Sequence, residues 1–294
     1  MITRRTMLKA SATALLAAGM WPGRLRAADT ATKPLKFIQV NDLHYFDDLC
    51  APFFEGMVAK MNTLEPAFVL IVGDLVDEGK SGQCHAIHDI LRSLKAPYFV
   101  TPGNHDHLTQ TDRGPFESVF GQEFNVWREE NGWQFVGLDS SDGILYEKVS
   151  VKQPTLDFVA SLPSKLDKNK PTFIYTHFPL GPGVQYELVN AKNVLEPLKE
   201  LNIAAIFNGH FHGFTEKKVL SDRIVTTNRC CARKRTNHDN TWQKGFFVIE
   251  AADGKWKRTF VEYGTDLANS AKPSGRRPQI QASTQPADPS RPSY

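Results

Sequence analysis

The 294-residue chain is poor in cysteine and has no apolar run long enough to cross a membrane. Its four cysteines are too few for a disulfide-dense fold, and they lack the spacing of metal ligands. The apolar stretch from Ala10 to about Trp21 is well short of the ~20 residues that span a bilayer, so no transmembrane anchor is predicted. Hydrophobic residues make up 41% of the chain and charged residues 23%, which excludes a disordered or collagen-like protein and favours a soluble globular one.

Acidic residues are absent before Asp29. A basic start, the short apolar stretch and small residues follow one another there, which is the pattern of an export signal. The run Thr3-Arg-Arg-Thr-Met-Leu-Lys9 resembles the twin-arginine export motif, and this resemblance implies bacterial export of a folded protein through the twin-arginine translocon. We therefore predict a signal peptide over residues 1–28 and a periplasmic or secreted protein. A basic amphipathic helix is the alternative, but helical periodicity is poor here.

The other end of the chain is also atypical. Residues 264–294 are rich in Pro, Ser, Gln and Ala, which predicts a disordered tail. The net charge of +3 arises at the two ends of the chain. Five basic residues precede Asp29, and four basic residues and one acidic residue follow Leu267. The core between them has 26 basic and 31 acidic residues. The core is therefore acidic, and no nucleic-acid-binding surface is indicated.

Apolar, β-branched runs alternate with helix-like stretches in the first part of the core. This alternation favours a parallel sheet flanked by helices. The predicted strands are 35–40, 67–72, 98–100, 133–138, 172–176 and 203–207, and the predicted helices are 52–64, 82–94, 115–120, 154–162 and 191–201. After Gly213 come short strands with hairpin signals (216–220, 223–227, 245–250 and 255–262), which predict an antiparallel addition to the sheet or a second sheet packed on it. No repeat or linker interrupts this region, so we predict one domain over 29–263.

Polar residues follow the strongest of the predicted strands. Because loops at the carboxyl ends of parallel strands form the ligand crevice of an open sheet, these residues are expected to converge on one edge. The spacing from Asp42 to Asp74, and from Asp74 to Asn104, is close to the length of one strand–helix–strand unit. The candidate metal ligands are Asp42, His44, Asp74, Asn104, His177, His210 and His212.

This donor set predicts a particular kind of metal centre. Carboxylate, amide and imidazole donors without thiolate suit Mn, Fe, Zn or similar ions. Seven donors exceed the need of one tetrahedral ion, so two ions that share a carboxylate are the economical solution. Two metals ~3.5–4 Å apart can hold a phosphoryl group and activate a water molecule.

The combined motifs resemble those of the calcineurin-like metallophosphoesterase superfamily. They are Asp42-x-His44, Gly73-Asp74, Gly103-Asn104-His105-Asp106, His177 and Gly209-His210-x-His212, which together span 171 residues. The resemblance implies a four-layer α/β/β/α sandwich of two packed mixed sheets flanked by helices. It also implies one ion on Asp42, His44, Asp74 and His212, and a second on Asp74, Asn104, His177 and His210, with Asp74 as the bridge. His105 resembles the family's non-ligand catalytic histidine, which faces the phosphate.

The sequence around Gly73–Asp77 has no tyrosine, unlike purple acid phosphatases, and is more similar to class III cyclic-nucleotide phosphodiesterases and glycerophosphodiesterases. The expected reaction is hydrolysis of a phosphomonoester or phosphodiester by attack of a metal-bound hydroxide on phosphorus. His105 would donate a proton to the leaving oxygen or stabilise charge on the phosphoryl group. One alternative is a catalytically silent binding or scaffold protein, in which we would expect lost ligands. Another is a non-phosphate metallohydrolase, but its His-x-His-x-Asp-His pattern is absent.

Several residues admit two interpretations from sequence. Asp106 could orient His105 or cap a helix. The basic stretch Arg229–Arg235, together with His238, could present cations to an anionic substrate or form a solvated loop. The pairing of Cys50, Cys84, Cys230 and Cys231 cannot be predicted from their positions.

Overall fold

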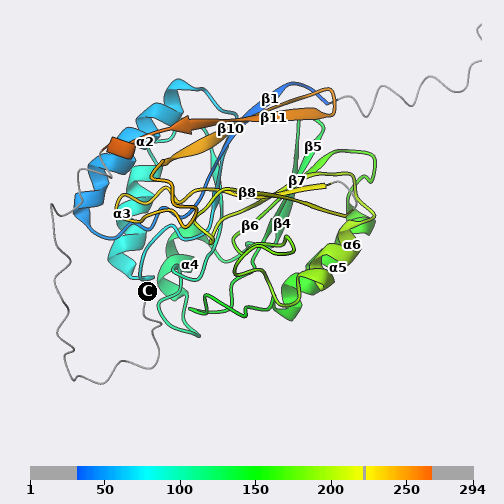
Figure 1. The fold of residues 1–294 in the computed structure, drawn as a ribbon, viewed down its shortest axis with the longest axis horizontal. Helices are drawn as coiled ribbons and strands as arrows, with labels where there is room; N and C mark the ends of the chain where they lie inside the picture. Colours follow the sequence, from blue (N-terminus) through cyan, green and yellow to red (C-terminus); the bar gives the residue numbers. More distant parts are fainter. Residues whose placement is uncertain (1–31, 221–222, 267–294) are drawn as a thin grey trace, which may run out of the picture.

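The computed structural model describes residues 32–220 and 223–266. The predicted signal peptide and the hairpin signal predicted at Ser221-Asp222 lie outside the described residues, as does the predicted tail apart from residues 264–266. The described chain forms two sheets packed face to face, with α2, α3 and α4 outside one sheet and α5 and α6 outside the other (Figure 1). The predicted four-layer α/β/β/α architecture is thus confirmed.

The first sheet has the strand order β11-β10-β1-β2-β3. Strands β1, β2 and β3 run parallel, whereas β10 pairs antiparallel with both β1 and β11. The strands are β1 (Leu35–Val40), β2 (Val69–Val72), β3 (Tyr98–Thr101), β10 (Gly245–Ala252) and β11 (Lys255–Glu262). Its outer face is covered by α2 (Ala51–Thr63), α3 (Ser81–Leu91) and α4 (Gly114–Phe120), and a short 3-10 helix, η1 (Asp48–Cys50), precedes α2.

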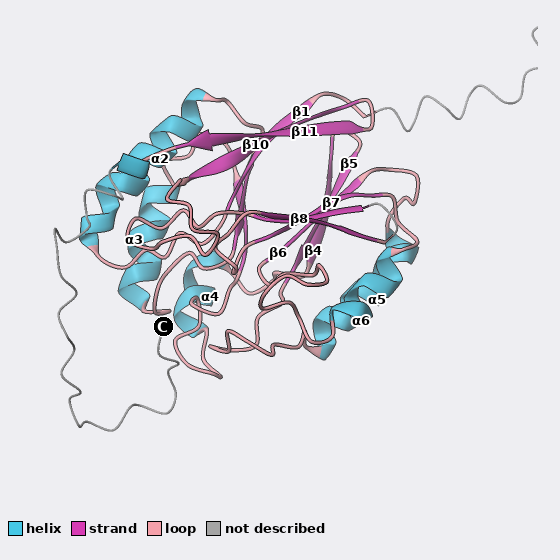
Figure 2. Cartoon of the chain, viewed as in Figure 1, coloured by secondary structure: helices cyan, strands magenta, loops and turns pink. Residues whose placement is uncertain are grey.

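The second sheet has the order β4-β5-β6-β7-β9-β8. Its inner strands β5, β6, β7 and β9 are parallel, and antiparallel β4 and β8 form the two edges. The strands are β4 (Val126–Glu130), β5 (Trp133–Leu138), β6 (Thr172–Thr176), β7 (Ile203–Asn208), β8 (Thr215–Val219) and β9 (Arg223–Thr227). Helices α5 (Gln153–Lys165) and α6 (Ala191–Leu198) cover the outer face (Figure 2).

Alternation along the strands explains why both faces of each sheet are buried. In β1, Phe37 points toward the other sheet, whereas Ile38 and Val40 pack under the helices. The space between the sheets is filled largely by aromatic rings. Phe173 is central, with ring centroids 5.3 Å from Phe37 and 5.6 Å from Phe207. Each such ring removes about 150–250 Å² from water, which makes this interface a major source of stability.

The structure refines two of the sequence predictions. Both alternatives for the region after Gly213 occur, since β10 and β11 extend the first sheet while β8 and β9 extend the second. Strand β4 was not predicted, because Val-Trp-Arg-Glu-Glu carries three charges in five residues and lacks the apolar run of a central strand. In the described part of the chain, no helix is both long and apolar enough to cross a membrane.

Candidate metal centre

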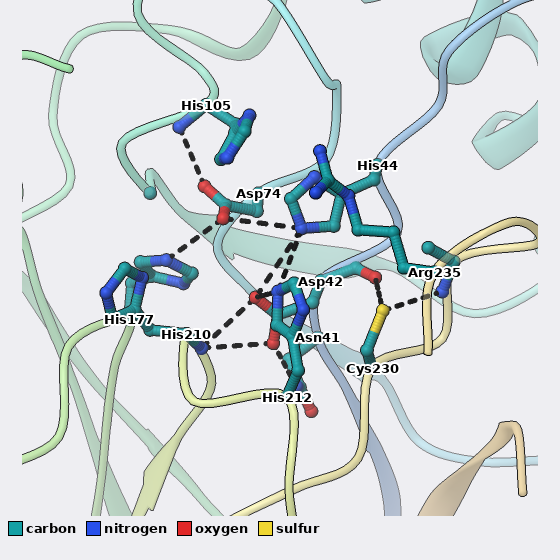
Figure 3. A network of polar contacts seen from close by, with 12 residues as sticks. Asn41, Asp42, His44, Asp74, His105, His177, His210, His212, Cys230 and Arg235 are labelled. Carbon is teal, nitrogen blue, oxygen red and sulfur yellow. Dashed lines mark hydrogen bonds and ion pairs between the residues drawn. The ribbon is translucent and has the colours of Figure 1, made fainter. Parts of the chain in front are cut away.

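The candidate ligands converge where the two sheets meet. Asp42 and His44 follow β1, Asp74 follows β2, and Asn104 follows β3 of the first sheet. His177 follows β6 of the second sheet, and the other two histidines follow β7. Figure 3 shows Asp74 among the side chains of Asp42, His44, His177, His210 and His212. All seven are buried, and they are Asp42, His44, Asp74, Asn104, His177, His210 and His212.

One group of donor atoms contains Asp42, His44, Asp74 and His212, whose ligand atoms all lie within 4.8 Å of one another. The Nε2 atom of His44 lies 3.0 Å from Nε2 of His212 and 3.5 Å from Oδ2 of Asp74. The Nε2 atom of His212 lies 3.1 Å from Oδ1 of Asp42. Four O and N donors around one point form a set that one divalent ion can take.

A second group contains Asp74, His177 and His210. The Oδ2 atom of Asp74 lies 3.3 Å from Nε2 of His177. Asn104 is also close to Asp74, because its neighbour His105 donates its backbone N–H to Asp74 Oδ1 over 2.9 Å. Asp74 is therefore common to both groups, as a bridging ligand must be.

Two buried atoms test whether this site suits metal ions. Asp74 Oδ2 and His177 Nε2 are close, but neither has a hydrogen bond of suitable geometry among the described residues. Leaving such atoms unsatisfied costs about 1–3 kcal/mol each, so the pair is expected to share a positively charged partner, which is a proton on His177 in the metal-free protein or a metal ion when one is bound. The donors thus fit two metal ions, while the assignment of individual ligands stays a prediction.

Three of the four candidate-ligand imidazoles, those of His44, His177 and His210, are oriented by a hydrogen bond from the nitrogen that points away from the centre. His44 Nδ1 donates to Asp77 Oδ1 over 3.1 Å, and His177 Nδ1 donates to the Val72 carbonyl over 3.2 Å. His210 uses Nε2, which donates to the Tyr146 carbonyl over 2.7 Å. These contacts fix the tautomer and leave the remaining nitrogen of each ring as a metal donor.

The backbone at the centre adopts a conformation that side chains usually avoid. Five candidate ligands have left-handed φ angles: Asp42 at 53°, His44 at 46°, Asp74 at 52°, His210 at 64° and His212 at 52°. Each costs on the order of 1 kcal/mol and persists only where surrounding contacts enforce it. Here the Asp42 N–H donates to the Gly73 carbonyl and the His44 N–H donates to the Asp74 carbonyl. The strand-end loops are thereby held together, with their side chains turned inward.

Two glycines of the motifs allow this close approach. A Cβ at Gly73 would lie 2.1 Å from Nδ1 of His177, and a Cβ at Gly103 would lie 2.1 Å from Oδ1 of Asp74. Any other residue at either position would therefore displace a candidate ligand.

The electrostatics of the metal-free centre follow from its burial and its mixed charges. Burial opposes ionisation of Asp74, but the imidazoles of His177 and His105 outweigh it and hold the pKa of Asp74 well below its usual range. Burial favours neutral His177, yet the carboxylates of Asp74 and Asp42 raise its pKa to about 9. Burial lowers the pKa of His210 to about 3, helped by the charge on His177. In the absence of metal, a proton on His177 partly balances the carboxylates.

His105 lies beside the donor groups, with its side chain 11% exposed. Its Nδ1 donates to the Asp77 carbonyl over 2.7 Å, which leaves Nε2 as the ring atom that can exchange a proton with a ligand. The ring is 4.6 Å from that of His44, measured between centroids. This position agrees with a non-ligand histidine next to the metals, although its catalytic role stays a prediction.

Asp106 performs neither of the roles considered from sequence. Its Oδ1 accepts the N–H groups of Leu75 and Val76 over 2.8 and 3.1 Å, and its Oδ2 accepts that of Gly103 over 2.8 Å. It therefore ties the loop after β2 to the loop after β3. Burial, together with the nearby charge of Asp74, raises the pKa of Asp106 to about 7.

A cavity of about 290 Å³ opens above the donor groups. Its floor includes Asp74, His105, His210 and His212, and its walls include Tyr146, Tyr186, Lys234, Arg235, Thr236 and His238. Only part of the basic stretch Arg229–Arg235 is placed to present cations to an anionic substrate. Arg235, Lys234 and the nearby His238 line the cavity, whereas Arg229 pairs with Asp239 over 3.2 Å.

Two further charged residues support Arg235. Its guanidinium forms an ion pair with Asp77, the same carboxylate that accepts from His44. Its carbonyl accepts from Nζ of Lys244, a lysine only 1% exposed, which also donates to Asn237 Oδ1 over 3.3 Å. Sequence reasoning missed the roles of Asp77 and Lys244. The sequence could have indicated Asp77, because it is the last residue of the Gly-Asp-Leu-Val-Asp motif. No motif indicates a role for Lys244.

All four cysteines are free thiols and buried. Burial, with the charge of Asp106, raises the pKa of Cys84 to about 12, and burial raises the pKa of Cys231 to about 12 as well. Cys230 Sγ donates to the Asp42 carbonyl over 3.3 Å. The cysteines therefore act as small core residues and as support for the centre.

Fold, donor set and cavity together define a metal-dependent phosphoric ester hydrolase. The chain belongs to the calcineurin-like phosphoesterase family, because the model of that family matches residues 35–214, more than half of the chain. The match begins at β1 and ends just after His212, so it contains every candidate ligand.

Curated relatives share moderate identity with the chain. A probable cyclic nucleotide phosphodiesterase of Xenorhabdus bovienii is 25% identical over 195 residues, which cover 62% of this chain and 74% of that protein. A UDP-2,3-diacylglucosamine pyrophosphatase of Chlamydia muridarum is 23% identical over 215 residues, covering 61% of this chain and 64% of that protein. A probable glycerophosphodiester phosphodiesterase of Arcobacter nitrofigilis is 28% identical over 167 residues, covering 53% and 60%. The chain spans less than two thirds of the length of the last two.

Solved structures share the fold. A dimetal phosphatase from Danio rerio superposes with a TM-score of 0.57 at 12% identity, over 78% of this chain and 99% of that chain. A purple acid phosphatase from yellow lupin superposes with a TM-score of 0.57 at 11% identity, over 79% of this chain and 52% of that chain. At these identities the likeness establishes the architecture alone.

Proposed function

We propose that the protein is an exported dimetal phosphoesterase that hydrolyses phosphomonoester or phosphodiester bonds. The observation that carries this proposal is the pair of buried donor groups that share Asp74 beneath a cavity lined by His105 and Arg235. The curated relatives include a probable cyclic nucleotide phosphodiesterase and a probable glycerophosphodiester phosphodiesterase, which favours a phosphodiester as the substrate.

The proposed chemistry divides between the metals and the protein. When bound, two ions would polarise the phosphoryl oxygens and lower the pKa of a water molecule. His105, held by the Asp77 carbonyl at Nδ1, would supply a proton from Nε2 to the leaving oxygen. Arg235, held against Asp77, would pair with the negative charge that the phosphoryl group carries in both the substrate and the transition state.

A substrate screen tests the proposed function. Protein loaded with Mn²⁺ or Zn²⁺ is assayed on phosphomonoesters, cyclic nucleotides, glycerophosphodiesters and phospholipids, with the bound metal counted in the same samples. We expect turnover of at least one class and loss of that turnover after chelation. Fully metal-loaded protein that hydrolyses none of them would instead favour a silent binding or scaffold protein.

Export is a separate part of the proposal. It is supported by the basic, acid-free segment over residues 1–28 with its paired Arg4 and Arg5. Replacing both arginines with lysine should keep the protein in the cytoplasm of a bacterial host, as judged by fractionation. Unchanged periplasmic delivery of that variant would reject the twin-arginine route.

A further inference from the structure

Two tyrosines from different loops form one side of the cavity. Tyr146 lies between β5 and α5, and Tyr186 lies between β6 and α6. Both are half-buried and line the cavity, with ring centroids 6.2 Å apart at an angle of 63°. The ring of Tyr186 also lies 5.2 Å from that of His210, at 74°. We refer to Tyr146 and Tyr186 as the aromatic wall.

The two loops that carry the aromatic wall are joined to each other. The Val189 N–H donates to the Val149 carbonyl over 2.8 Å. Asn190 bonds in both directions with Val151, accepting its N–H over 2.8 Å and donating to its carbonyl over 3.0 Å. The two tyrosines are therefore carried on a single hydrogen-bonded unit rather than on independent loops.

The aromatic wall is also fixed relative to the candidate ligands. The carbonyl of Tyr146 accepts the hydrogen bond that orients His210, over 2.7 Å. A shift of the Tyr146 backbone would therefore disturb a ligand, so the wall has a defined position above the centre.

The backbone of Tyr186 carries a further sign of constraint. Its φ of 63° lies in the left-handed region, which a bulky side chain rarely occupies. The surrounding loop enforces this conformation: the Glu187 N–H donates to the Val184 carbonyl, and the Leu188 N–H donates to the Pro179 carbonyl. Such outliers cluster at ligand sites, where the constraint serves to hold a side chain in place.

The opposite side of the cavity has a different chemistry. Lys234 and Arg235 contribute positive charge there, and His105 and Arg235 both contact Asp77. Figure 3 shows His210 and Arg235 on opposite sides of Asp42 and Asp74. A phosphoryl group placed over Asp74 thus has a proton donor and cations on one side and aromatic rings on the other.

We propose that the aromatic wall binds a planar ring of the substrate. The ring belongs to the substituent of the phosphorus atom that points away from His105. The proposal rests on the proposed function, because it assigns a substituent of the same phosphoester substrate. Edge-to-face and offset contacts between rings add about 0.5–1.5 kcal/mol beyond area burial, so a ring is favoured over a small alkyl group by up to about tenfold. The substrate class is therefore an ester of phosphoric acid with an aryl or heteroaryl substituent.

Binding of two non-hydrolysable probes tests this assignment without turnover. Benzylphosphonate and methylphosphonate carry the same charged group and differ in the ring. Their dissociation constants are measured by calorimetry on Mn²⁺-loaded wild-type protein and on the variants Tyr186→Ala, Tyr146→Ala and Tyr186→Phe. Trp127→Ala is the matched control, because Trp127 is an aromatic residue that is 43% exposed and does not line the cavity.

We expect wild-type protein to bind benzylphosphonate about five- to tenfold more tightly than methylphosphonate. The preference should fall to about twofold or less in each alanine variant and persist in Tyr186→Phe and Trp127→Ala. Equal affinities in wild-type protein, or a preference that survives in either alanine variant, would overturn the proposal. If Tyr186→Ala does not fold, Tyr146→Ala still decides the question.

The binding test separates this proposal from the proposed function. A ring preference in a protein that hydrolyses no phosphoester would leave the aromatic wall standing and reject the proposed reaction. Hydrolysis without a ring preference would retain the reaction and reject the aromatic wall.

Discussion

At the scale of single residues, the imidazole nitrogens of His44, His177 and His210 that point away from the centre matter as much as the candidate donor nitrogens. Asp77 shows this most clearly, because its carboxylate accepts from His44 and pairs with Arg235 while its carbonyl accepts from His105. One residue therefore orients a candidate ligand, a candidate proton donor and a cation. Contacts of this kind convert a collection of donors into a site with a defined geometry.

The first prediction concerns His105. Replacing it with alanine should keep two metal ions per chain and lower kcat on a phosphodiester by about 10²–10⁴-fold, because it removes a proton donor without removing a ligand. The measurement is turnover together with metal counting. His85→Ala, at an exposed histidine on α3, is the control and should have wild-type activity. Full turnover of His105→Ala with both metals bound would reject the proposed role.

The second prediction concerns the metal-free protein and His177. The pKa of this group is raised from 6.5 to about 9 in the folded state, mainly by Asp74 and Asp42 acting against burial. Its protonated form therefore stabilises the fold below pH 6.5, and this contribution is lost as pH rises through 9. The unfolding free energy of the chelated protein is expected to fall by about 1 kcal/mol between pH 7 and 8.

Urea unfolding of wild type and His177→Gln at both pH values provides the measurement. The variant should lose most of the slope and keep only a small part from Asp106, whose pKa of about 7 lies at the edge of this range. The comparison stops at pH 8 because the thiols of the unfolded chain ionise above it. Equal slopes in the two proteins would contradict the assignment of the charge to His177.

The seven candidate ligands were predictable because each follows a strand, and the ends of strands meet. The supporting residues were not, since their partners come from distant segments. Lys244 holds the Arg235 carbonyl from the start of β10, and no periodicity or motif indicates that contact. The tyrosines of the aromatic wall meet only because two loops are joined by hydrogen bonds at Asn190.

At the scale of elements, the segment between β9 and β10 determines what the cavity presents to a substrate. It carries Lys234, Arg235, Thr236 and His238 to the cavity. Its anchor is the buried ammonium group of Lys244, which donates to the Arg235 carbonyl and to the Asn237 side chain. A lysine that is 1% exposed is rare, and here its hydrogen bonds offset the loss of water.

The third prediction tests this anchor. Lys244→Met removes the donors but keeps a side chain of similar length, so Arg235 should lose its fixed position. We expect KM for bis-p-nitrophenyl phosphate to rise by about tenfold with kcat changed by less than about threefold, because ground-state and transition-state binding weaken together. Lys257→Met, at a lysine that is 71% exposed on β11, is the control. An unchanged KM in Lys244→Met would show that the anchor does not position Arg235.

The elements themselves were mostly predictable from apolar periodicity. Strand β4 was the exception, because an edge strand needs only one apolar face and here carries three charged residues. The assignment of late strands to sheets was not predictable either. Strands β8 and β9 join the second sheet, while β10 and β11 cross to the first, and only the packing of the two sheets determines this.

At the scale of the whole molecule, the two sheets have to be held in register for the centre to exist. The first sheet supplies Asp42, His44, Asp74 and Asn104, and the second supplies His177, His210 and His212. Phe173 lies in the aromatic layer between the sheets, with its ring 5.3 Å from Trp133 and 5.7 Å from Trp256. The same layer that stabilises the fold therefore aligns the two halves of the site.

The fourth prediction follows from that layer. Phe173→Ala should lower the unfolding free energy by about 3–5 kcal/mol, because it removes a fully buried ring and leaves a cavity between the sheets. Urea unfolding of the chelated protein measures this, with Trp127→Ala as an exposed aromatic control that should change stability by less than about 1 kcal/mol. A loss below about 1 kcal/mol for Phe173→Ala would contradict the packing described here.

The most direct test of the central claim is a metal titration of chelated protein. The rate of phosphodiester hydrolysis is followed as Mn²⁺ is added, and the bound metal is counted at each point, for wild type and for Asp74→Ala. Because Asp74 belongs to both donor groups, wild-type activity should rise until two ions are bound per chain, while the variant should neither hold two ions nor recover activity. Saturation at one ion, activity without metal, or two ions per chain in Asp74→Ala would contradict a two-metal centre bridged by Asp74.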